Sequence, residues 1–256
     1  MAGRGSIVWL ASYPKSGNTW LRAVLTALTA PPGAPLALDR LVGSPSTTMR
    51  GQFDEHVGLA SSDMTEAEID LYRPAFHRML AAETPAPLFV KVHNPLDVAV
   101  SFAHHNRMSL DEIVARMNSD AYALRGNDGS LPAVLPQRLC SWSTHVAGWL
   151  DQTALDTLVL RYEDILAHPS EAFGAVVRKV GLPVAAAALE SAIQAADFRR
   201  LRAQERANGF AERQPTATSF FRAGRAGDGK RCLSAAQIRD IVSVHGNVMR
   251  RLAYIE

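Results

Sequence analysis

The stretch that most constrains the fold is residues 7–28, IVWLASYPKSGNTWLRAVLTAL. Its first five residues form a continuous apolar run of the kind that a buried parallel strand shows. Pro14 and Gly17 break the strand pattern, and apolar residues then recur at helical spacing from Trp20 onward. A strand that passes through a short loop into a helix leaves the first N–H groups of the helix free to bind an anion. The pattern therefore predicts a phosphate-binding loop with Lys15 as its cation.

Two more apolar runs are typical of buried strands and occupy residues 88–92 and 157–161. Periodicity and capping residues predict helices at residues 65–82, 96–105, 109–118, 137–150 and 234–254, and through most of residues 162–207. Regular patterns are missing from residues 31–58, 126–136 and 208–229, which are expected to be loops. Short strands separated by helices predict an α/β fold, with a parallel β-sheet flanked by helices in a single domain over residues 1–256.

Three chemically useful side chains follow the three predicted strands. Lys15, His93 and Tyr162 each come just beyond the C-terminal end of a different strand. Ligands of open parallel sheets bind outside these ends. We therefore expect the three side chains to face one ligand site.

Composition limits the partners and the compartment. The formal net charge of +2 over 256 residues gives no reason to expect nucleic acid as a partner. Cys140 and Cys232 are too few for a disulfide framework and indicate a reducing, cytoplasmic location. No apolar stretch reaches the length of a membrane span, and no group of histidine, cysteine and acidic residues has the spacing of metal ligands, so no metal is expected.

Several stretches, in order along the chain, resemble the signatures of one enzyme family. Residues 13–20, YPKSGNTW, match the phosphosulfate-binding loop of the cytosolic-type sulfotransferases at every specified place. Residues 94–101, NPLDVAVS, are similar to the family's segment for the 3′-phosphate of the donor nucleotide. Residues 141–149, 160–164 and 220–230 resemble further family segments, the first being a helix common in bacterial members. Ordered matches of this kind are more specific than one motif.

The resemblance implies a donor, an acceptor and a fold. The donor would be 3′-phosphoadenosine 5′-phosphosulfate (PAPS), and the product adenosine 3′,5′-bisphosphate (PAP). The acceptor would be a hydroxyl group of a small molecule. The fold would be the three-layer architecture of P-loop nucleotide kinases. Contacts to the donor would come from Lys15, Ser16, Gly17, Asn18, Thr19, Trp20, Ser101, Tyr162, Phe198, Arg222 and Gly224.

These contacts fall into three groups by implied role. Lys15 and Thr19 would hold the 5′-phosphate, and Lys15 would also neutralise charge on the leaving oxygen. The 3′-phosphate would be bound by Ser101, Arg222 and Gly224. The adenine would be contacted by Trp20, Tyr162 and Phe198, although core packing is the alternative for Trp20 and Phe198.

Sulfuryl transfer also needs a base for the acceptor's hydroxyl proton, and a histidine suits that task near neutral pH. The base of the family lies in a Lys-x-His pattern, which residues 91–93 (KVH) match. The resemblance therefore implies that His93 and Lys15 are the catalytic residues. Three other histidines match no family role and are interpreted as surface or structural: His104, His105 and His145.

One departure from the family affects His93 directly. In the family, the Lys-x-His and Asn-Pro motifs end successive parallel strands that a crossover separates. Here the two are fused in residues 91–95, KVHNP, so one strand is missing. If residues 88–92 keep their own strand position, His93 is the base. If they have moved to the position of the missing neighbour, His93 faces the 3′-phosphate, where the family has arginine, and the base is lost. The sequence leaves both placements open.

The function has two alternatives at the level of sequence. A catalytically silent relative would bind PAP without transferring a sulfuryl group. A P-loop kinase would need a Mg²⁺-binding hydroxyl directly after Gly-Lys, and Gly17-Asn18 does not supply it. A milder departure lies in residues 220–230, where Ala223 and Gly229 replace a lysine and a tryptophan of the family. No motif indicates the acceptor or the oligomeric state.

Overall fold

The computed structural model describes residues 9–31, 34–41, 48–82, 88–124, 134–152, 156–213 and 217–256. Within these residues, the central sheet has three parallel strands, β1 (Trp9–Ser12), β2 (Leu88–Val92) and β5 (Thr157–Arg161), in the order β1-β2-β5. Ser12 pairs with Lys91, which pairs with Leu160, so the strands end together at one edge of the sheet. The predicted parallel sheet is confirmed, and β2 pairs by backbone hydrogen bonds with β1 on one side and with β5 on the other.

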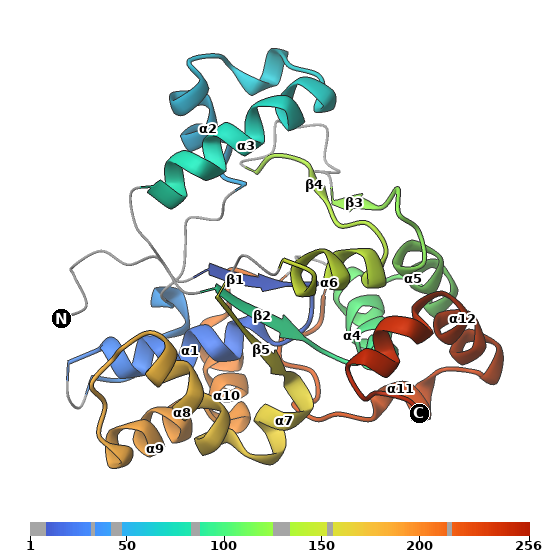
Figure 1. The fold of residues 1–256 in the computed structure, drawn as a ribbon. Coiled ribbons are helices and arrows are strands. Elements are labelled where there is room, and N and C mark those ends of the chain that lie inside the picture. The colour runs from blue at the N-terminus through green and yellow to red at the C-terminus, as the bar shows by residue number, and fades with distance from the viewer. Residues whose placement is uncertain are drawn as a thin grey trace.

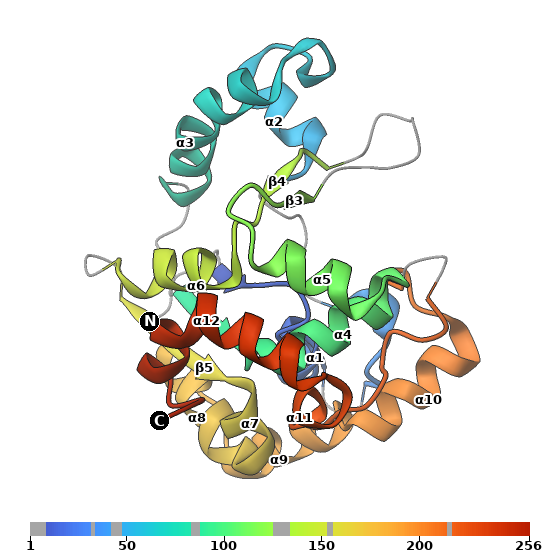
Figure 2. The same cartoon turned by 90° about the vertical axis from the view of Figure 1, so that its right-hand side faces the viewer.

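Helices cover both faces of this sheet, as Figure 1 shows. One face carries α1 (Asn18–Thr29), α8 (Pro169–Lys179), α9 (Ala186–Ala195) and α10 (Phe198–Asn208). The other face carries α4 (Pro95–Asn106), α5 (Leu110–Met117), α6 (Trp142–Leu150) and α12 (Ala235–Arg251), which Figure 2 shows face-on. Each face has its own apolar core, with Val92 in one and Leu160 in the other. The predicted three-layer α/β architecture is therefore confirmed.

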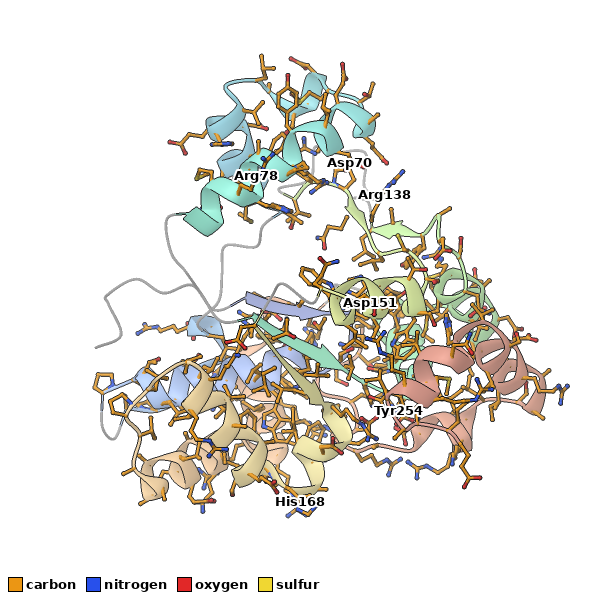
Figure 3. The ribbon with its side chains drawn as sticks, viewed as in Figure 1. Asp70, Arg78, Arg138, Asp151, His168 and Tyr254 are labelled. Carbon is orange, nitrogen blue, oxygen red and sulfur yellow. The ribbon has the colours of Figure 1, made fainter. Side chains whose placement is uncertain are left out.

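A smaller helical unit stands away from the sheet at the top of Figure 1 and consists of α2 (Arg50–Val57) and α3 (Glu66–Ala82). Its centre is an edge-to-face pair of buried rings, Phe53 and Phe76, whose centroids are 5.6 Å apart. An ion pair of 3.6 Å between Asp70 of α3 and Arg138 connects this unit to a small antiparallel sheet, as the two labels in Figure 3 show. That sheet pairs β3 (Ala123–Leu124) with β4 (Gln137–Arg138).

Short elements complete the described chain: the 3-10 turns Leu38–Arg40 and Ser61–Asp63, and the helices α7 (Tyr162–Ala167) and α11 (Asp228–Cys232). The helix predicted at residues 65–82 is confirmed as α3, with Thr65 and Glu68 exchanging capping hydrogen bonds before its first turn. Among the described helices, none has the length and the apolar character that crossing a membrane requires.

The predicted helix at residues 137–150 is wrong over its first five residues. Residues 137 and 138 belong to β4, and Cys140 has a φ angle of 56°, which an α-helix excludes. The helix begins at Trp142, because Ser141 caps it by accepting a 3.2 Å hydrogen bond from the backbone N–H of Thr144. The apolar residues keep a helical spacing through residues 137–141 although this stretch forms β4 and a turn, so the spacing alone predicted too early a start for the helix.

The predicted loop at residues 31–58 is also partly wrong, because it contains α2 and the turn Leu38–Arg40. The helix α2 is polar in sequence and depends on Phe53, which is fully buried against α3. The last helix, predicted to reach residue 254, ends at Arg251, and Ala253 has a φ of 54°. Residues 7–8, 32–33, 42–47, 126–133 and 214–216, on which other predictions fell, lie outside the described residues.

Candidate active site

A cavity of about 600 Å³ lies at the carboxyl ends of the three parallel strands. Its walls come from residues 12–20 after β1, 93–105 after β2, 162–169 after β5, and from later parts of the chain, residues 193–201, Glu212 and residues 220–228. Lys15, His93 and Tyr162, which the sequence places at three strand ends, all line it. The topology of the sheet thus produces the common ligand site that the strand ends predicted.

The turn between β1 and α1 is shaped by Gly17, the N-cap residue of α1. Its φ angle is 82°, a left-handed conformation that favours glycine. A Cβ atom at this position would lie 2.8 Å from the ring of Tyr162. Because no side chain caps α1, the first amide groups of this helix are left to bind an anion.

Lys15 supplies the positive charge beside that helix end. Its ammonium lies 3.9 Å from the centre of the Phe220 ring, inside the cavity. Burial lowers the pKa of Lys15 to about 8, against the opposing effect of Glu212 and Glu205. Among the described residues, it makes no ion pair with a carboxylate. A bound anion would therefore give this ammonium a counterion.

A second lysine, Lys91, lies beneath the turn. It is 2% exposed, and its ammonium donates a 2.7 Å hydrogen bond to the backbone carbonyl of Gly17. The rings of Trp20 and Tyr162 lie at 5.7 Å from the same atom. Burial lowers the pKa of Lys91 to about 7. The Lys-x-His pattern includes Lys91 but predicts no contact for it. The contact arises because the pairing of β2 with β1 brings Lys91 to the loop.

His93 lies between two carboxylates and is 5% exposed. Its Nε2 is 3.5 Å from Asp97 Oδ2 and 3.7 Å from Glu163 Oε1, while Nδ1 is 3.4 Å from the carbonyl oxygen of Lys15. The ring also packs on Tyr162, with 4.4 Å between centroids. Both ring nitrogens thus face oxygen atoms of the protein, a position that favours donation of hydrogen bonds.

Asp97 joins α4 to the segment that follows residue 217. Its two carboxylate oxygens accept hydrogen bonds of 2.7 Å and 2.6 Å from the backbone N–H groups of Gly227 and Gly229. Burial alone would raise the pKa of Asp97, but the hydrogen bonds with His93 and with these two amides lower it. Sequence reasoning missed this role, because no local pattern shows which backbone amides an aspartate will meet.

His93, Asp97 and Glu163 also bring their ligand atoms within 4.8 Å of one another, close enough to consider a metal ion. However, all four carboxylate oxygens already accept hydrogen bonds. Those of Asp97 bind Gly227 and Gly229, and those of Glu163 bind the Asn94 amide and the Tyr254 hydroxyl. Tyr254 is labelled in Figure 3. These donors compete with a cation for the same oxygens, so the absence of a metal stays our prediction.

A cluster of three arginines surrounds Asp228 at another part of the cavity wall. Asp228, only 2% exposed, accepts hydrogen bonds from Arg222, Arg225 and Arg231. Burial opposes ionisation of Asp228, but the three arginines lower its pKa to about 2. The carboxylate therefore fixes Arg222 at the cavity wall, where its charge faces the enclosed space.

Two glycines allow this segment to pack closely. A Cβ on Gly224, whose φ is 62°, would lie 2.4 Å from the ring of Phe198. A Cβ on Gly229 would lie 2.5 Å from the backbone of Leu96 in α4. The tryptophan expected at position 229 would collide with that backbone, so the departure noted in sequence follows from direct contact between α4 and α11.

A family model for the sulfotransferase domain matches residues 6–253. The chain belongs to the sulfotransferase domain family. Sulfotransferase 1A1 of Bos taurus is 24% identical over 259 residues, covering 89% of this chain and 78% of that protein. Sulfotransferase 2B1 of Homo sapiens is 22% identical over 253 residues, covering 91% of this chain and 63% of that protein. This sulfotransferase therefore spans less than two thirds of the human relative.

Solved sulfotransferase structures share its fold. Mouse sulfotransferase SULT7A1 complexed with PAP has a TM-score of 0.61 at 16% identity, covering 97% of this chain and 86% of that chain. Retinol dehydratase, in complex with androsterone and the inactive cofactor PAP, has a TM-score of 0.55 at 17% identity, covering 94% and 80%. The family and the fold predicted from the motifs are confirmed, and the chain is a sulfotransferase enzyme by family.

The donor contacts predicted for this sulfotransferase are brought together almost completely. All of them line the cavity except Ser16, which is 1% exposed and whose hydroxyl is buried without a hydrogen-bond partner among the described residues. Trp20 and Phe198 line the cavity and also pack against the apolar core of the α1 face. The two interpretations of these rings, ligand contact and core packing, are therefore compatible.

Glu212 is a site residue that the sequence did not indicate. It lines the cavity, and its carboxylate accepts a 3.2 Å hydrogen bond from the Thr19 hydroxyl and pairs with Arg22. A carboxylate of the protein thus lies against the helix end that was predicted to bind a phosphate. No pattern marks Glu212, because it comes from a loop far along the chain.

The three histidines without a family role lie in different environments in the structure. The imidazole of His145 is structural: its Nδ1 lies 3.2 Å from the Leu139 carbonyl and its ring packs edge-on against Tyr13. The Nε2 of His104 is 3.3 Å from the Ser219 carbonyl, and His104 does not line the cavity. His105 lines the cavity and packs edge-on against Phe220, so its interpretation as a surface or structural residue stays a prediction.

Proposed function

We propose that this sulfotransferase transfers a sulfuryl group from PAPS to a hydroxyl of a small molecule, leaving PAP. The observation that carries the proposal is the presence of two separate anion-binding groups in one cavity. Lys15 and the start of α1 form one, and Arg222 and Ser101 contribute to the other. A nucleotide with phosphates at its 5′ and 3′ positions has the matching pair of anions. The PAP in two related structures supports the same donor.

The 5′ end of the donor would lie at the β1–α1 turn. Backbone amides of residues 17–19 and the Thr19 hydroxyl would bind the 5′-phosphate, with the Asn18 side chain beside them. Lys15 would neutralise the charge that develops on the bridging oxygen as the S–O bond breaks, which is the main electrostatic task in a transfer of this type. The adenine would lie among the rings of Trp20, Tyr162 and Phe198.

The 3′-phosphate would lie between α4 and the arginine cluster. Arg222 is fixed by Asp228, while Asp97 ties the backbone of Gly227 and Gly229 to α4. Gly224 leaves its own backbone exposed to the phosphate, because it has no side chain. Ser101 lies one helical turn beyond Asp97 on the same face of α4.

We further propose that His93 occupies the position of the family's arginine. The strand β2 leads directly into α4, the helix that carries Asp97 and Ser101, so the residue between them belongs to the 3′-phosphate side. His93 also lies between the carboxylates of Asp97 and Glu163, where a guanidinium would find two partners. This is the second of the two placements that the fused motif allows.

The acceptor is proposed as a small molecule with a hydroxyl group, as androsterone and retinol are in complexes of the related retinol dehydratase. A cytoplasmic location, action as one domain over residues 1–256, and independence from nucleic acid and metal complete the proposal. The two free cysteines support the cytoplasmic location. The near-neutral net charge supports the independence from nucleic acid.

The experiment that tests the donor assignment is calorimetric titration with PAP, in parallel with adenosine 5′-monophosphate. Binding of PAP that is tighter by at least about tenfold would show that the 3′-phosphate has a site of its own, since that ratio is about 1.4 kcal/mol. Equal affinity for the two nucleotides would contradict the proposal. Lys15→Ala should abolish binding of both, whereas Lys230→Ala, at an exposed position outside the cavity, should leave it unchanged.

A further inference from the structure

A second cavity, of about 530 Å³, lies beside the C-terminal half of α10, and we call it the α10 cavity. Among the described residues, none lines both this cavity and the one at the strand ends. Consecutive residues divide between the two at three places, residues 201–202, 212–213 and 219–220. The two cavities therefore lie back to back on the same three stretches of chain.

Three arginines give the α10 cavity its charge. Arg202 and Arg206 are four residues apart on one face of α10, and Arg213 follows the end of the helix. Among the described residues, none of the three forms an ion pair with a carboxylate. The arginines around Asp228 differ in this respect, because all of them are paired with that residue.

The carboxylate on the described wall of the α10 cavity belongs to Glu205, which is 5% exposed. Its two oxygens accept hydrogen bonds of 2.5 Å and 3.0 Å from the backbone N–H groups of Phe220 and Phe221. Glu205 thus holds the chain between the two cavities, and three positive charges face its single negative charge. A cavity with this surplus favours an anion.

Arg202 has a donor that lacks the partner its burial requires. Its Nε is buried and has no hydrogen-bond partner among the described residues. A buried donor without an acceptor is costly, and such groups in folded proteins usually meet a bound ion or water. Arg206 lies in the last turn of α10, where the helix dipole favours a cation with or without a ligand. Arg202 is therefore the residue that points to a ligand.

The chemistry of the wall indicates the class of ligand. Guanidinium groups donate paired hydrogen bonds to the oxygens of phosphate and sulfate groups. Thr218 and Ser219 line the same wall, and their hydroxyl groups can donate as well. The described wall has no aromatic residue on which a nucleotide base could stack. The volume of the cavity leaves room for a group attached to the anion.

We propose that the α10 cavity is a second anion site of this protein, which binds a phosphate or sulfate group, either free or as a monoester. The site goes beyond the proposed sulfuryl transfer, because none of the proposed donor contacts lies on its wall.

Calorimetric titration with inorganic phosphate at constant ionic strength tests the site. The protein is first saturated with PAP, so that the cavity at the strand ends is occupied. We expect one site with a Kd at or below about 1 mM. Arg206→Gln and Arg213→Gln should each weaken binding by at least about tenfold, because each removes a charged hydrogen bond to the anion. Arg200→Gln, at an exposed position of α10 outside both cavities, should keep the wild-type affinity.

Three results would overturn the proposal. A Kd above about 1 mM in the wild type would show that the cavity attracts anions without binding them. Equal losses in Arg206→Gln and Arg200→Gln would show a general effect of charge on α10, and unchanged affinity in Arg206→Gln and Arg213→Gln would place the anion elsewhere. If PAP does not bind, the donor proposal fails separately. Phosphate binding that Arg206→Gln weakens and Lys15→Ala does not would then still support the second site.

Phenyl phosphate and phenyl sulfate distinguish a free anion from a monoester. Tighter binding of these esters than of inorganic phosphate, lost in Arg206→Gln, would show that the cavity also takes the attached group. Tighter binding of inorganic phosphate would identify the free anion as the ligand. In both cases the backbone amide NMR signals of Thr218 and Ser219 should shift on binding, and binding without these shifts would overturn the placement.

Discussion

The ammonium of Lys91 donates a 2.7 Å hydrogen bond to the carbonyl oxygen of Gly17, and this contact ties the middle strand of the sheet to the anion-binding turn. Ser12, the last residue of β1, pairs with Lys91 in the sheet, so the lysine rises directly beneath the loop that follows. The turn is therefore held from below by a side chain that no bound nucleotide needs to touch.

Lys91→Met should lower both stability and affinity for PAP, because methionine fills the space but leaves the Gly17 carbonyl only its hydrogen bonds from the Trp20 and Leu21 amides, at 3.2 Å and 3.5 Å. Loss of one hydrogen bond costs about 0.5–1.5 kcal/mol. Urea unfolding measures that loss, and calorimetry with PAP measures the effect on the turn. Unchanged affinity together with reduced stability would show that the turn keeps its shape without Lys91.

Stability should also rise with pH above neutrality through Lys91. The folded-state pKa of Lys91 is about 7, below the usual lysine value of 10.5, so between these values the unfolded chain binds more protons than the folded chain. The cost of burying the charge is therefore full below about pH 7 and falls away as the pH approaches the unfolded value. Urea midpoints across this range should rise in the wild type. In Lys91→Met the rise should be smaller, and an equal rise in both proteins would contradict the prediction.

Gly229→Ala should separate the arginine cluster from α4, because the new methyl group would lie 2.5 Å from the Leu96 backbone. Overpacking of this kind costs about 1–3 kcal/mol. Affinity for PAP should fall, while affinity for adenosine 5′-monophosphate, which has no 3′-phosphate, should change little. The control is Gly51→Ala on α2, where a Cβ meets nothing within 4 Å. Parallel losses for both nucleotides would show a general collapse of the cavity instead.

His93→Asn tests the placement of the fused motif. If His93 supports the 3′-phosphate side of the cavity, its loss leaves the carboxylates of Asp97 and Glu163 without the imidazole between them and loosens that wall, so affinity for PAP should fall by about 10–100-fold. Binding of adenosine 5′-monophosphate should be nearly unchanged. If affinity for PAP is retained and turnover stops, His93 is the base, as the family pattern first suggested.

The parts of the fold that sequence predicted well are those in which local signals and tertiary packing agree. The strands at residues 88–92 and 157–161 match their predicted bounds, because runs of apolar and β-branched residues favour the strands of a parallel sheet. Ser109 and Ser234 were recognised as helix starts, and both form capping boxes. The phosphate-loop pattern of residues 13–20 also predicted the position of the site, because there too the local signals agree with the packing around the turn.

The missed features depend on contacts between residues far apart in sequence. Residues 137–141 have apolar spacing that suits a helix, but pairing of β4 with β3 and the left-handed Cys140 exclude one. Asp97 and Glu212 acquire their partners only when distant loops fold over the sheet. The spacing of Asp97, Ser101 and His105 on one face of α4 is the sequence signal that places His105 at the cavity.

Glu212→Gln should tighten the binding of PAP, because the Glu212 carboxylate lies where the donor's 5′-phosphate is proposed to bind. It accepts a hydrogen bond from Thr19 and pairs with Arg22, and it also acts electrostatically on Lys15. Its side chain is 38% exposed, so solvent screens these interactions, and we expect a gain of only about twofold to fivefold in affinity. The gain should shrink at high salt. Glu55→Gln, on the exposed surface of α2, is the control that removes the same charge elsewhere. Weaker binding in Glu212→Gln than in this control would mean that Glu212 orients Thr19 and Arg22 for the donor instead of competing with it.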